Sequence, residues 1–157
     1  MIIRNILRAC ANNLAQARIP APRPALHTPR MPEEKPQQGA SGLPHERLKV
    51  YQLAEELATL MFTIAQRVPP AQHDLRTHTE RTAGSITANT AEGALELSPG
   101  KKAQYYRIAR ASAGELHAHV LSLRRLNFAS REEVLAAAAL IDRISAMLYR
   151  LIQRFGG

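Results

Sequence analysis

The sequence predicts an all-α protein: an antiparallel up-down-up-down four-helix bundle over residues 45–157, preceded by a disordered Pro-rich and Arg-rich tail over residues 1–44. Apolar residues recur at the i, i+3, i+4, i+7 spacing of amphipathic helices in four segments. The sequence has no alternating Val, Ile and Thr runs and no Asn-Gly or Asp-Gly turn signals, which would favour strands and hairpins. Four long helices joined by short links favour a bundle.

The tail is predicted from its prolines. Seven of the ten prolines lie within residues 20–44, where they prevent a long helix and remove backbone donors. Few apolar residues separate them, so this stretch cannot offset the entropy lost on ordering. Residues 1–30 carry five arginines and no acidic residue. Three interpretations of residues 1–30 stay open: a true translation start at Met31, plain disorder, or a targeting segment of the transit-peptide or weak signal type.

The first two helices are expected from His45 to Val68 and over residues 73–95. Pro69-Pro70 ends the first helix, because the residue before a proline disfavours helical backbone. Its apolar stripe consists of Val50, Leu53, Ala54, Leu57, Leu60, Met61, Ile64 and Val68. The second stripe is mostly small and polar, which would let a neighbouring helix approach closely; it consists of Leu75, Thr79, Thr82, Ala83, Ile86, Asn89 and Thr90.

The third and fourth helices are expected over residues 99–127 and 131–155. Ser98-Pro99 has the form of an N-cap followed by proline at the first helical position, and Ser130 with Glu133 is spaced as a capping box. The third helix is expected to bury Tyr105, Ile108, Ala109, Ser112, Leu116, His119, Val120 and Leu123. The fourth is expected to bury Val134, Leu135, Ala138, Ile141, Ile144, Leu148, Leu151 and Ile152.

The charge is positive and unevenly spread. The chain has 21 basic and 13 acidic residues, a net charge of +8. Residues 1–30 contribute +5 and residues 101–157 contribute +6, whereas residues 46–100 carry −2. A basic balance favours polyanionic partners such as nucleic acid. Of the basic residues 17 are arginine, which suits bidentate phosphate contacts but would also follow from a GC-rich genome.

Several classes of site and location are excluded by composition. Cys10 is the only cysteine, so an intramolecular disulfide and a cysteine-based zinc or iron–sulfur site are ruled out. A single cysteine suits the cytoplasm. No uncharged apolar stretch approaches the roughly 20 residues that span a bilayer, so neither a transmembrane helix nor a membrane partner is expected.

Candidate catalytic chemistry is also missing from the sequence. A di-iron bundle needs Glu-x-x-His pairs, and no glutamate in the chain has a histidine three residues later. His117 with His119, and His73 with His78, are spaced off one helical face and cannot share a metal within a helix. The sequence therefore predicts no enzyme activity, no cofactor and no metal site.

The basic residues of the last two helices are the remaining signal for function. They could line a phosphate-tracking surface, and Tyr105 or Tyr106 could stack on a base beside them. The alternative is a solvated outer face whose charges are paired with acids. The candidate nucleic-acid-binding residues are Lys101, Lys102, Arg107, Arg110, Arg124 and Arg125, with Arg143, Arg150 and Arg154 on the last helix.

Three motifs occur in order along the helices. Residues 48–54 read LKVYQLA, residues 81–93 read RTAGSITANTAEG, and residues 105–116 read YYRIARASAGEL. They resemble the helix start, the central signature ending in Asn-x-Ala-Glu-Gly, and the third-helix motif of the bacterial 23S rRNA intervening sequence protein family. The resemblance covers residues 46–155. Glu80, Thr87 and Ala111 depart from the family pattern, and Glu80 leaves Arg81 without a neighbouring arginine.

The resemblance implies a small cytoplasmic bacterial protein that forms an antiparallel four-helix bundle and often a ring-like pentamer. A related branch, the accessory proteins of diversity-generating retroelements, binds nucleic acid and partners a reverse transcriptase. The motif residues with an expected structural or interface role are Arg81, Ser85, Asn89, Glu92, Gly93, Ser112 and Glu115. We expect Asn89 to tie helices together, Glu92 to pair with Arg81 or Arg110, and Gly93 to permit a close contact or a helix end.

Taken together, these observations predict a non-enzymatic homo-oligomeric bundle that associates with RNA or DNA or serves as a scaffold. The alternative is an adaptor that recognises an acidic protein partner.

Overall fold

The computed structural model describes residues 42–156, which contain four long α-helices, two short 3₁₀ helices and no strand. The prediction of an all-α chain with four long helices is confirmed for these residues. The predicted disorder and the open questions about residues 1–41 lie outside the described residues. In chain order the elements are η1 (Pro44–Arg47), α2 (Lys49–Ala65), η2 (Pro70–Gln72), α3 (His73–Leu95), α4 (Pro99–Arg125) and α5 (Arg131–Gly156).

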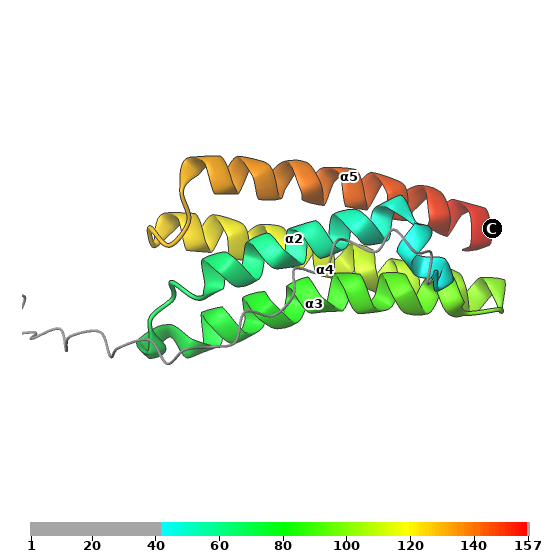
Figure 1. Ribbon diagram of the computed structural model, residues 1–157, viewed down its shortest axis with the longest axis horizontal. Helices are drawn as coiled ribbons and strands as arrows, with labels where there is room; N and C mark the ends of the chain where they lie inside the picture. The colour runs from blue at the N-terminus through cyan, green and yellow to red at the C-terminus, as the bar shows by residue number, and fades with distance from the viewer. Residues whose placement is uncertain (1–41, 157) are drawn as a thin grey trace, which may run out of the picture. The chain divides into compact units, whose positions relative to one another are not determined.

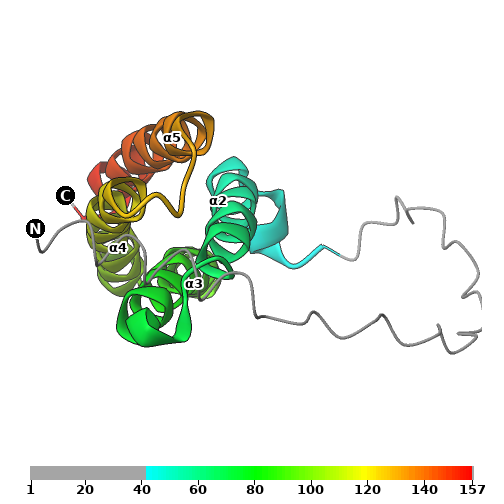
Figure 2. The same ribbon diagram turned by 90° about the vertical axis from the view of Figure 1, so that its left-hand side faces the viewer.

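Each long helix packs against the next one in the chain, and α5 returns to contact α2. Figure 1 shows the chain direction reversing at each link between long helices, and Figure 2 shows the helices arranged around a common interior. This arrangement is consistent with the expected up-down-up-down order. The α3–α4 and α4–α5 contacts are the most extensive, and the α2–α5 contact is the least extensive of the four.

The core is made of aliphatic side chains from all four helices and one aromatic ring, Tyr106, which is 2% exposed. The predicted stripe of α2 is buried except for Leu60, which packs against the core from its edge. The small, polar stripe of α3 is buried as predicted at Thr79, Thr82 and Thr90. Burying such short side chains lets α3 lie close to its neighbours.

The predicted stripes of α4 and α5 are wrong at several positions. On α4, Tyr106 is buried and Tyr105 is only half-buried, while Ile108 is exposed. On α5, Leu135 is 60% exposed, and Ala137 and Leu140 are buried in its place. The core face of α4 includes Ala103, Ala109 and Ala113, small residues that allow a close helix approach. A prediction weighted by hydrophobicity assigns isoleucine and leucine to the core in preference to alanine. It therefore places the core-facing side of the helix at the wrong angle around the helix axis.

Helix α2 is shorter than predicted at both ends. Leu48 has extended backbone (φ −78°, ψ 122°) and separates η1 from α2, so the helix begins at Lys49 instead of His45. At the other end, the N–H of Arg67 donates to the Ile64 carbonyl (3.0 Å) and that of Val68 to the Ala65 carbonyl (3.1 Å). These tight three-residue bonds end the helix before the prolines.

The link between α4 and α5 is fixed by hydrogen bonds at both of its ends. Asn127 has a φ of 61°. Its N–H donates to the Arg124 carbonyl (3.1 Å), and the N–H of Phe128 donates to the Leu123 carbonyl (2.9 Å). These bonds form a Schellman motif, which ends α4. The predicted capping box is confirmed: the Ser130 N–H donates to Glu133 Oε2 (2.8 Å), and the Glu133 N–H donates to Ser130 Oγ (3.2 Å).

The start of α4 matches the prediction only in part. Ser98 is the N-cap residue and Pro99 the first helical residue, but the Ser98 hydroxyl makes no capping bond. Instead the Ser98 N–H donates to Glu96 Oε1 at 2.8 Å. This bond is the largest cause that holds the pKa of the Glu96 carboxyl below its usual value, and Lys101 and Lys102 lower it further.

Candidate nucleic-acid interface

Positive charge is concentrated on α4 and α5. Residues 99–156 contain ten lysines and arginines against four acidic residues, a net charge of +6. Residues 49–95, which include α2 and α3, contain four basic and five acidic residues, a net charge of −1. The excess of positive charge in the described chain therefore lies on α4 and α5.

The cations of α4 and α5 form no direct ion pair in the described part of the chain. Within residues 42–156, none of their ten lysines and arginines forms an ion pair. Two of the acids that could have paired with them have other partners: Glu115 lies 3.5 Å from His119, and Glu133 is held by Arg67. None of these ten cations is therefore held in a direct ion pair within the described residues.

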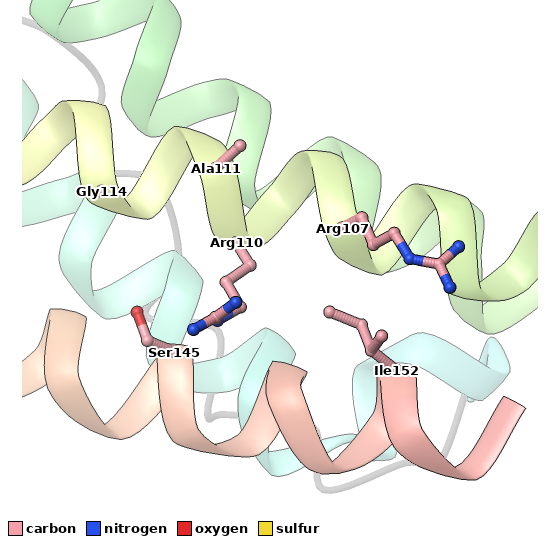
Figure 3. Close-up of a pocket in the computed structure, with 6 residues that line it drawn as sticks. All are labelled: Arg107, Arg110, Ala111, Gly114, Ser145 and Ile152. Carbon is pink, nitrogen blue, oxygen red and sulfur yellow. The ribbon is translucent and has the colours of Figure 1, made fainter. Parts of the chain in front are cut away.

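Two arginines of α4 share a groove with α5, named here the α4–α5 groove. It has a volume of about 290 Å³ and is lined by Arg107, Arg110, Ala111, Gly114, Ser145 and Ile152. Figure 3 shows the Arg110 side chain reaching from α4 towards Ser145, and Arg107 lying opposite Ile152. A methyl group added at Gly114 would meet no atom within 4 Å, so the groove is open there.

An aromatic ring lies beside this groove. Tyr149 is 50% exposed, and the Arg110 guanidinium carbon lies 5.5 Å from its ring centroid. That distance allows a cation–π contact, which holds Arg110 in place while leaving its N–H groups available. The sequence pattern did not indicate Tyr149 or Ser145 as site residues, and it placed Ile152 in the core. Ser145, Tyr149 and Ile152 follow one another at spacings of four and three residues, which places all three on one side of α5.

The six predicted basic residues do not form a single patch. Arg125 lies five helical turns after Arg107, so the two share one side of α4 at a separation of about 27 Å. Lys102 is turned away from the groove: its Nζ donates to the Ala94 carbonyl (3.1 Å) and lies 5.3 Å from the Phe155 ring centroid. The structure thus brings together Arg107 and Arg110, with Lys101 and Lys102 before them and Arg124 and Arg125 at the far end of α4.

The family-motif residues lie mainly between α3 and α4, where they form a polar contact named here the α3–α4 seam (Thr82, Ser85, Asn89, Ser112 and Glu115). The hydroxyls of Ser85 and Ser112 lie 2.9 Å apart, and the Thr82 hydroxyl donates to Glu115 Oε1 at 3.2 Å. Asn89 donates to the carbonyl (2.8 Å) and the hydroxyl (3.1 Å) of Ser85, on its own helix. The serine pair and the Thr82–Glu115 bond, not Asn89, join the two helices directly.

The charged motif residues make other contacts than expected. Glu92 is exposed and, within the described residues, pairs with neither Arg81 nor Arg110. Arg81 Nη2 lies 2.9 Å from His78 Nδ1. Glu80 accepts from Arg76 Nε at 3.0 Å, so the departure from the family pattern at this position gives a local ion pair on α3.

Gly93 permits close helix contact, as predicted. A Cβ atom at this position would lie 2.5 Å from Tyr106 Cε1 and 2.8 Å from Cδ1. The ring of Tyr106 therefore packs directly against the backbone of α3. The motif residues on the α3–α4 seam and Gly93 thus contribute to the close contact between α3 and α4.

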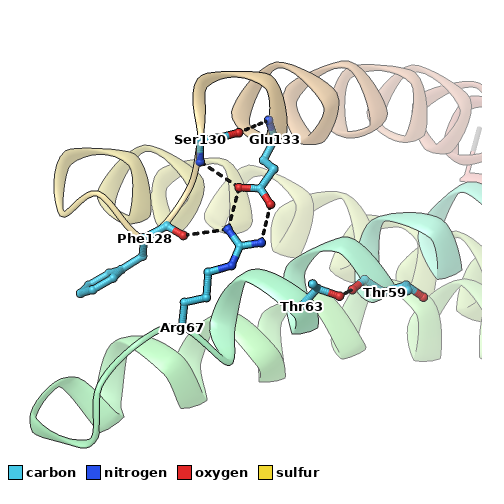
Figure 4. A network of polar contacts seen from close by, with 6 residues as sticks. All are labelled: Thr59, Thr63, Arg67, Phe128, Ser130 and Glu133. Carbon is cyan, nitrogen blue, oxygen red and sulfur yellow. Dashed lines mark hydrogen bonds and ion pairs between the residues drawn. The ribbon is translucent and has the colours of Figure 1, made fainter. Parts of the chain in front are cut away.

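A second polar network, between α2 and the start of α5, was not predicted from the sequence (Figure 4). Arg67 donates from Nη1 and Nη2 to the two carboxylate oxygens of Glu133 (2.8 and 2.6 Å) and from Nη1 to the Phe128 carbonyl (3.3 Å). The guanidinium, together with the Ser130 N–H, lowers the pKa of Glu133 to about 2. No sequence spacing signals a pair 66 residues apart.

The described residues were also compared with the requirements of a metal site and of a membrane-spanning helix. Among residues 42–156, no cluster of three or more His, Cys, Asp or Glu side chains is arranged to hold a metal ion. In that same part of the chain, no helix has both the length and the apolar character needed to cross a membrane.

A comparison with protein families identifies a match. The family model described as 23S rRNA-intervening sequence protein matches residues 46–150, which include α2, α3, α4 and most of α5. No curated protein matches the chain.

Proposed function

Because the chain belongs to the 23S rRNA-intervening sequence protein family, we propose that it is a non-enzymatic, homo-oligomeric, up-down-up-down four-helix bundle of the cytoplasm that associates with nucleic acid through α4 and α5. The observation that carries the proposal is the set of ten cations on these helices that make no ion pair within the described residues. A cation that forms no ion pair within the protein can pair with an external anion. Membership of the family supports the proposed fold, and the cations without ion pairs support nucleic acid as the partner.

The α4–α5 groove suits phosphate contacts. Arg107 and Arg110 lie one turn apart on its edge, and each guanidinium can bind a phosphate through two parallel N–H donors. The half-exposed ring of Tyr149 is positioned to stack on an unpaired base next to them. Tyr106 is buried and Tyr105 half-buried, so Tyr149 takes the stacking role assigned by sequence to that pair.

Arg124 and Arg125 would extend the contact along the helix. Arg125 shares the side of α4 that carries Arg107, about 27 Å away. Successive base pairs of a duplex are 3.4 Å apart, so this separation corresponds to about eight base pairs. Phosphates at both ends of α4 would then be contacted by one bundle, on RNA or on DNA.

Self-association is proposed through the middle of the same helix. Between the two arginine ends, the exposed residues of α4 on this side are small or apolar: Ala111, Gly114, Ala118 and Leu121. We name them the outer stripe of α4. Small side chains let a helix of a second copy approach closely. Ala111 and Gly114 also line the α4–α5 groove, so a second copy on this stripe would border Arg107 and Arg110. The pentamer and the reverse-transcriptase partner are expectations from the resemblance alone.

Loss of two groove arginines should weaken nucleic-acid binding and reduce its salt dependence. In the full chain, the double substitution Arg107→Gln, Arg110→Gln should weaken binding to duplex DNA and to a structured RNA. On duplex DNA the slope of log K against log salt should become shallower by about 2, since two phosphate contacts are lost. Fluorescence anisotropy across a salt series measures both quantities.

The matched control is Arg47→Gln, Arg81→Gln, which removes the same charge from exposed positions outside α4 and α5. Its slope should match that of the unchanged chain. Equal slopes for both double variants would mean that the groove is not the interface. In that case an adaptor for an acidic protein partner becomes the better description of the chain.

Disrupting the outer stripe of α4 should dissociate the oligomer. Leu121→Glu places a carboxylate at an exposed position of the stripe, so it should lower the molar mass seen by light scattering without unfolding the helices. Leu97→Glu is the control, because Leu97 is 93% exposed and lies in the turn between α3 and α4. A single-copy mass for the unchanged chain, or equal masses for all three proteins, would contradict self-association through this stripe.

A further inference from the structure

The side of α5 turned towards α2 carries another groove, named here the α2–α5 groove, which is distinct from the α4–α5 groove proposed for phosphate contacts. It has a volume of about 280 Å³ and lies where α2 begins and α5 ends. Ser145, which lines the α4–α5 groove, and Arg154, which lines this one, are nine residues apart. Nine residues are 2.5 helical turns, so these side chains point to opposite sides of α5.

The floor of the α2–α5 groove is apolar. It is formed by Leu48, Val50, Met147 and Leu151. Val50 belongs to the buried core, and the other three pack against that core from its edge. The apolar surface arises because the α2–α5 contact is the least extensive in the bundle, so the two helices do not cover each other fully at this end.

The rim of the groove is cationic on both edges. Lys49 lies on the α2 edge, and Arg150 and Arg154 lie on the α5 edge. All three are exposed, none forms an ion pair within residues 42–156, and no acidic residue lines the groove. The chemistry that complements this surface is an apolar group flanked by carboxylates.

We infer that the α2–α5 groove binds an acidic amphipathic helix of a partner protein. Leucine or phenylalanine side chains of that helix would pack on the floor, and glutamates or aspartates beside them would pair with Lys49, Arg150 and Arg154. This is the helix-in-groove mode of recognition, in which anchors one turn apart enter an apolar groove. The site shares no lining residue with the α4–α5 groove, although Arg150 and Arg154 belong to the ten cations of α4 and α5.

Two observations favour a peptide over other occupants. A volume of about 280 Å³ lies at the small end of the range for ligand pockets, so it accommodates one or two apolar side chains better than a whole cofactor. A polynucleotide would satisfy the three cations, but it has no alkyl side chains to cover Met147 and Leu151. The combination of apolar floor and cationic rim is satisfied fully by an acidic amphipathic peptide.

Three fluorescein-labelled peptides test the inference on the full chain. The first has leucines at every third or fourth position and glutamates between them. The second has alanine in place of each leucine, and the third has lysine in place of each glutamate. Fluorescence anisotropy should show saturable binding of the first peptide, with binding of the other two at least about tenfold weaker.

Protein variants locate the site. Arg150→Gln, Arg154→Gln and the separate floor variant Met147→Gln should each weaken the first peptide about tenfold. The control Arg124→Gln, Arg125→Gln removes the same charge from the far end of α4 and should leave the affinity unchanged. Melting temperatures report whether each variant is folded. Arg150 and Arg154 are both exposed, so the variant that replaces them should have the same melting temperature as the unchanged chain.

The outcomes that would overturn the inference are distinct. Equal binding of the leucine and alanine peptides would mean diffuse charge attraction without use of the floor. Equal weakening by both arginine pairs would place the peptide elsewhere. Absence of peptide binding together with a smaller oligomer for Met147→Gln would mean that a second copy of the chain occupies the groove. None of these results depends on whether the chain binds nucleic acid.

Discussion

Replacing Gly93 by valine is expected to lower the free energy of unfolding by about 3 kcal/mol, at the upper end of the range for overpacking a core. The Cβ atom would lie 2.5 Å from Tyr106 Cε1, closer than such atoms can approach, so the ring or the helix must move. The ring has little space to move because it is 2% exposed and packs among core residues. Urea or thermal unfolding of the full chain measures the change.

The alanine variants at two glycines should change stability in opposite directions. Gly93→Ala adds one methyl group against the ring and should destabilise. Gly114→Ala adds the same methyl group where no atom lies within 4 Å, so only helix propensity acts, and it should stabilise by up to about 1 kcal/mol. If Gly93→Ala also stabilises, the contact with Tyr106 does not limit the approach of α3 and α4.

A double-mutant cycle separates the contact from other effects of the glycine. Tyr106→Leu removes the ring that the new methyl group would strike, so Gly93→Ala should cost less in the Tyr106→Leu background than in the unchanged chain. The two positions are in contact, and coupling between contacting residues commonly reaches about 0.5–3 kcal/mol. Absence of coupling would mean that any cost of Gly93→Ala arises elsewhere.

The local structure was predicted better than the packing, and particular residues show why. The range 73–95 and the Ser130–Glu133 capping box depend on neighbours within a few residues, and both were predicted correctly. The choice between Tyr105 and Tyr106 depends on where Gly93 lets α4 approach α3. A distance between two helices cannot be read from the periodicity of one of them.

The sequence predicted which kind of residue makes up the candidate site but not how these residues are arranged in space. Sequence spacing indicated that basic residues gather on the last two helices, but it could not divide them between two grooves on opposite sides of α5. Arg107 and Arg110 face Ser145 and Ile152, whereas Arg150 and Arg154 face α2. That division follows from which neighbours α5 packs between, and this information resides in the tertiary contacts.

Removing the charge of Glu133 is expected to lower the free energy of unfolding by about 1–2 kcal/mol near neutral pH, and to flatten its acid dependence. In Glu133→Gln the amide can still accept from the Ser130 N–H, since glutamine also serves in a capping box. The loss is therefore that of the paired contact with Arg67. The glutamate side chain is 22% exposed and Arg67 about half, so solvent screening keeps the effect moderate.

The sign of the pH dependence follows from the direction of the pKa shift. In the folded chain the pKa of Glu133 is lowered from 4.5 to about 2, first by hydrogen bonds from Arg67 and then by the Ser130 N–H. The unfolded chain binds this proton more readily. The stabilisation is thus fully present above about pH 5 and is lost as the pH falls towards 2. Urea unfolding in this range should show a steeper decline for the unchanged chain than for Glu133→Gln.

Two variants on the arginine side decide whether the network, rather than general charge, is responsible. Arg67→Met removes the main cause of the lowered pKa of Glu133, so its stability should fall less steeply between pH 5 and 2 than that of the unchanged chain. Arg76→Met breaks the ion pair with Glu80 within α3, and such pairs contribute only about 0.3–0.5 kcal/mol.

If the two variants have the same pH profile, Glu133 is not held by Arg67 in solution. If only Arg67→Met flattens the profile, the ion pair fastens the end of α2 to the start of α5. The α2–α5 contact, the least extensive of the four, is then held by this pair at one end of the bundle and left partly open at the α2–α5 groove at the other.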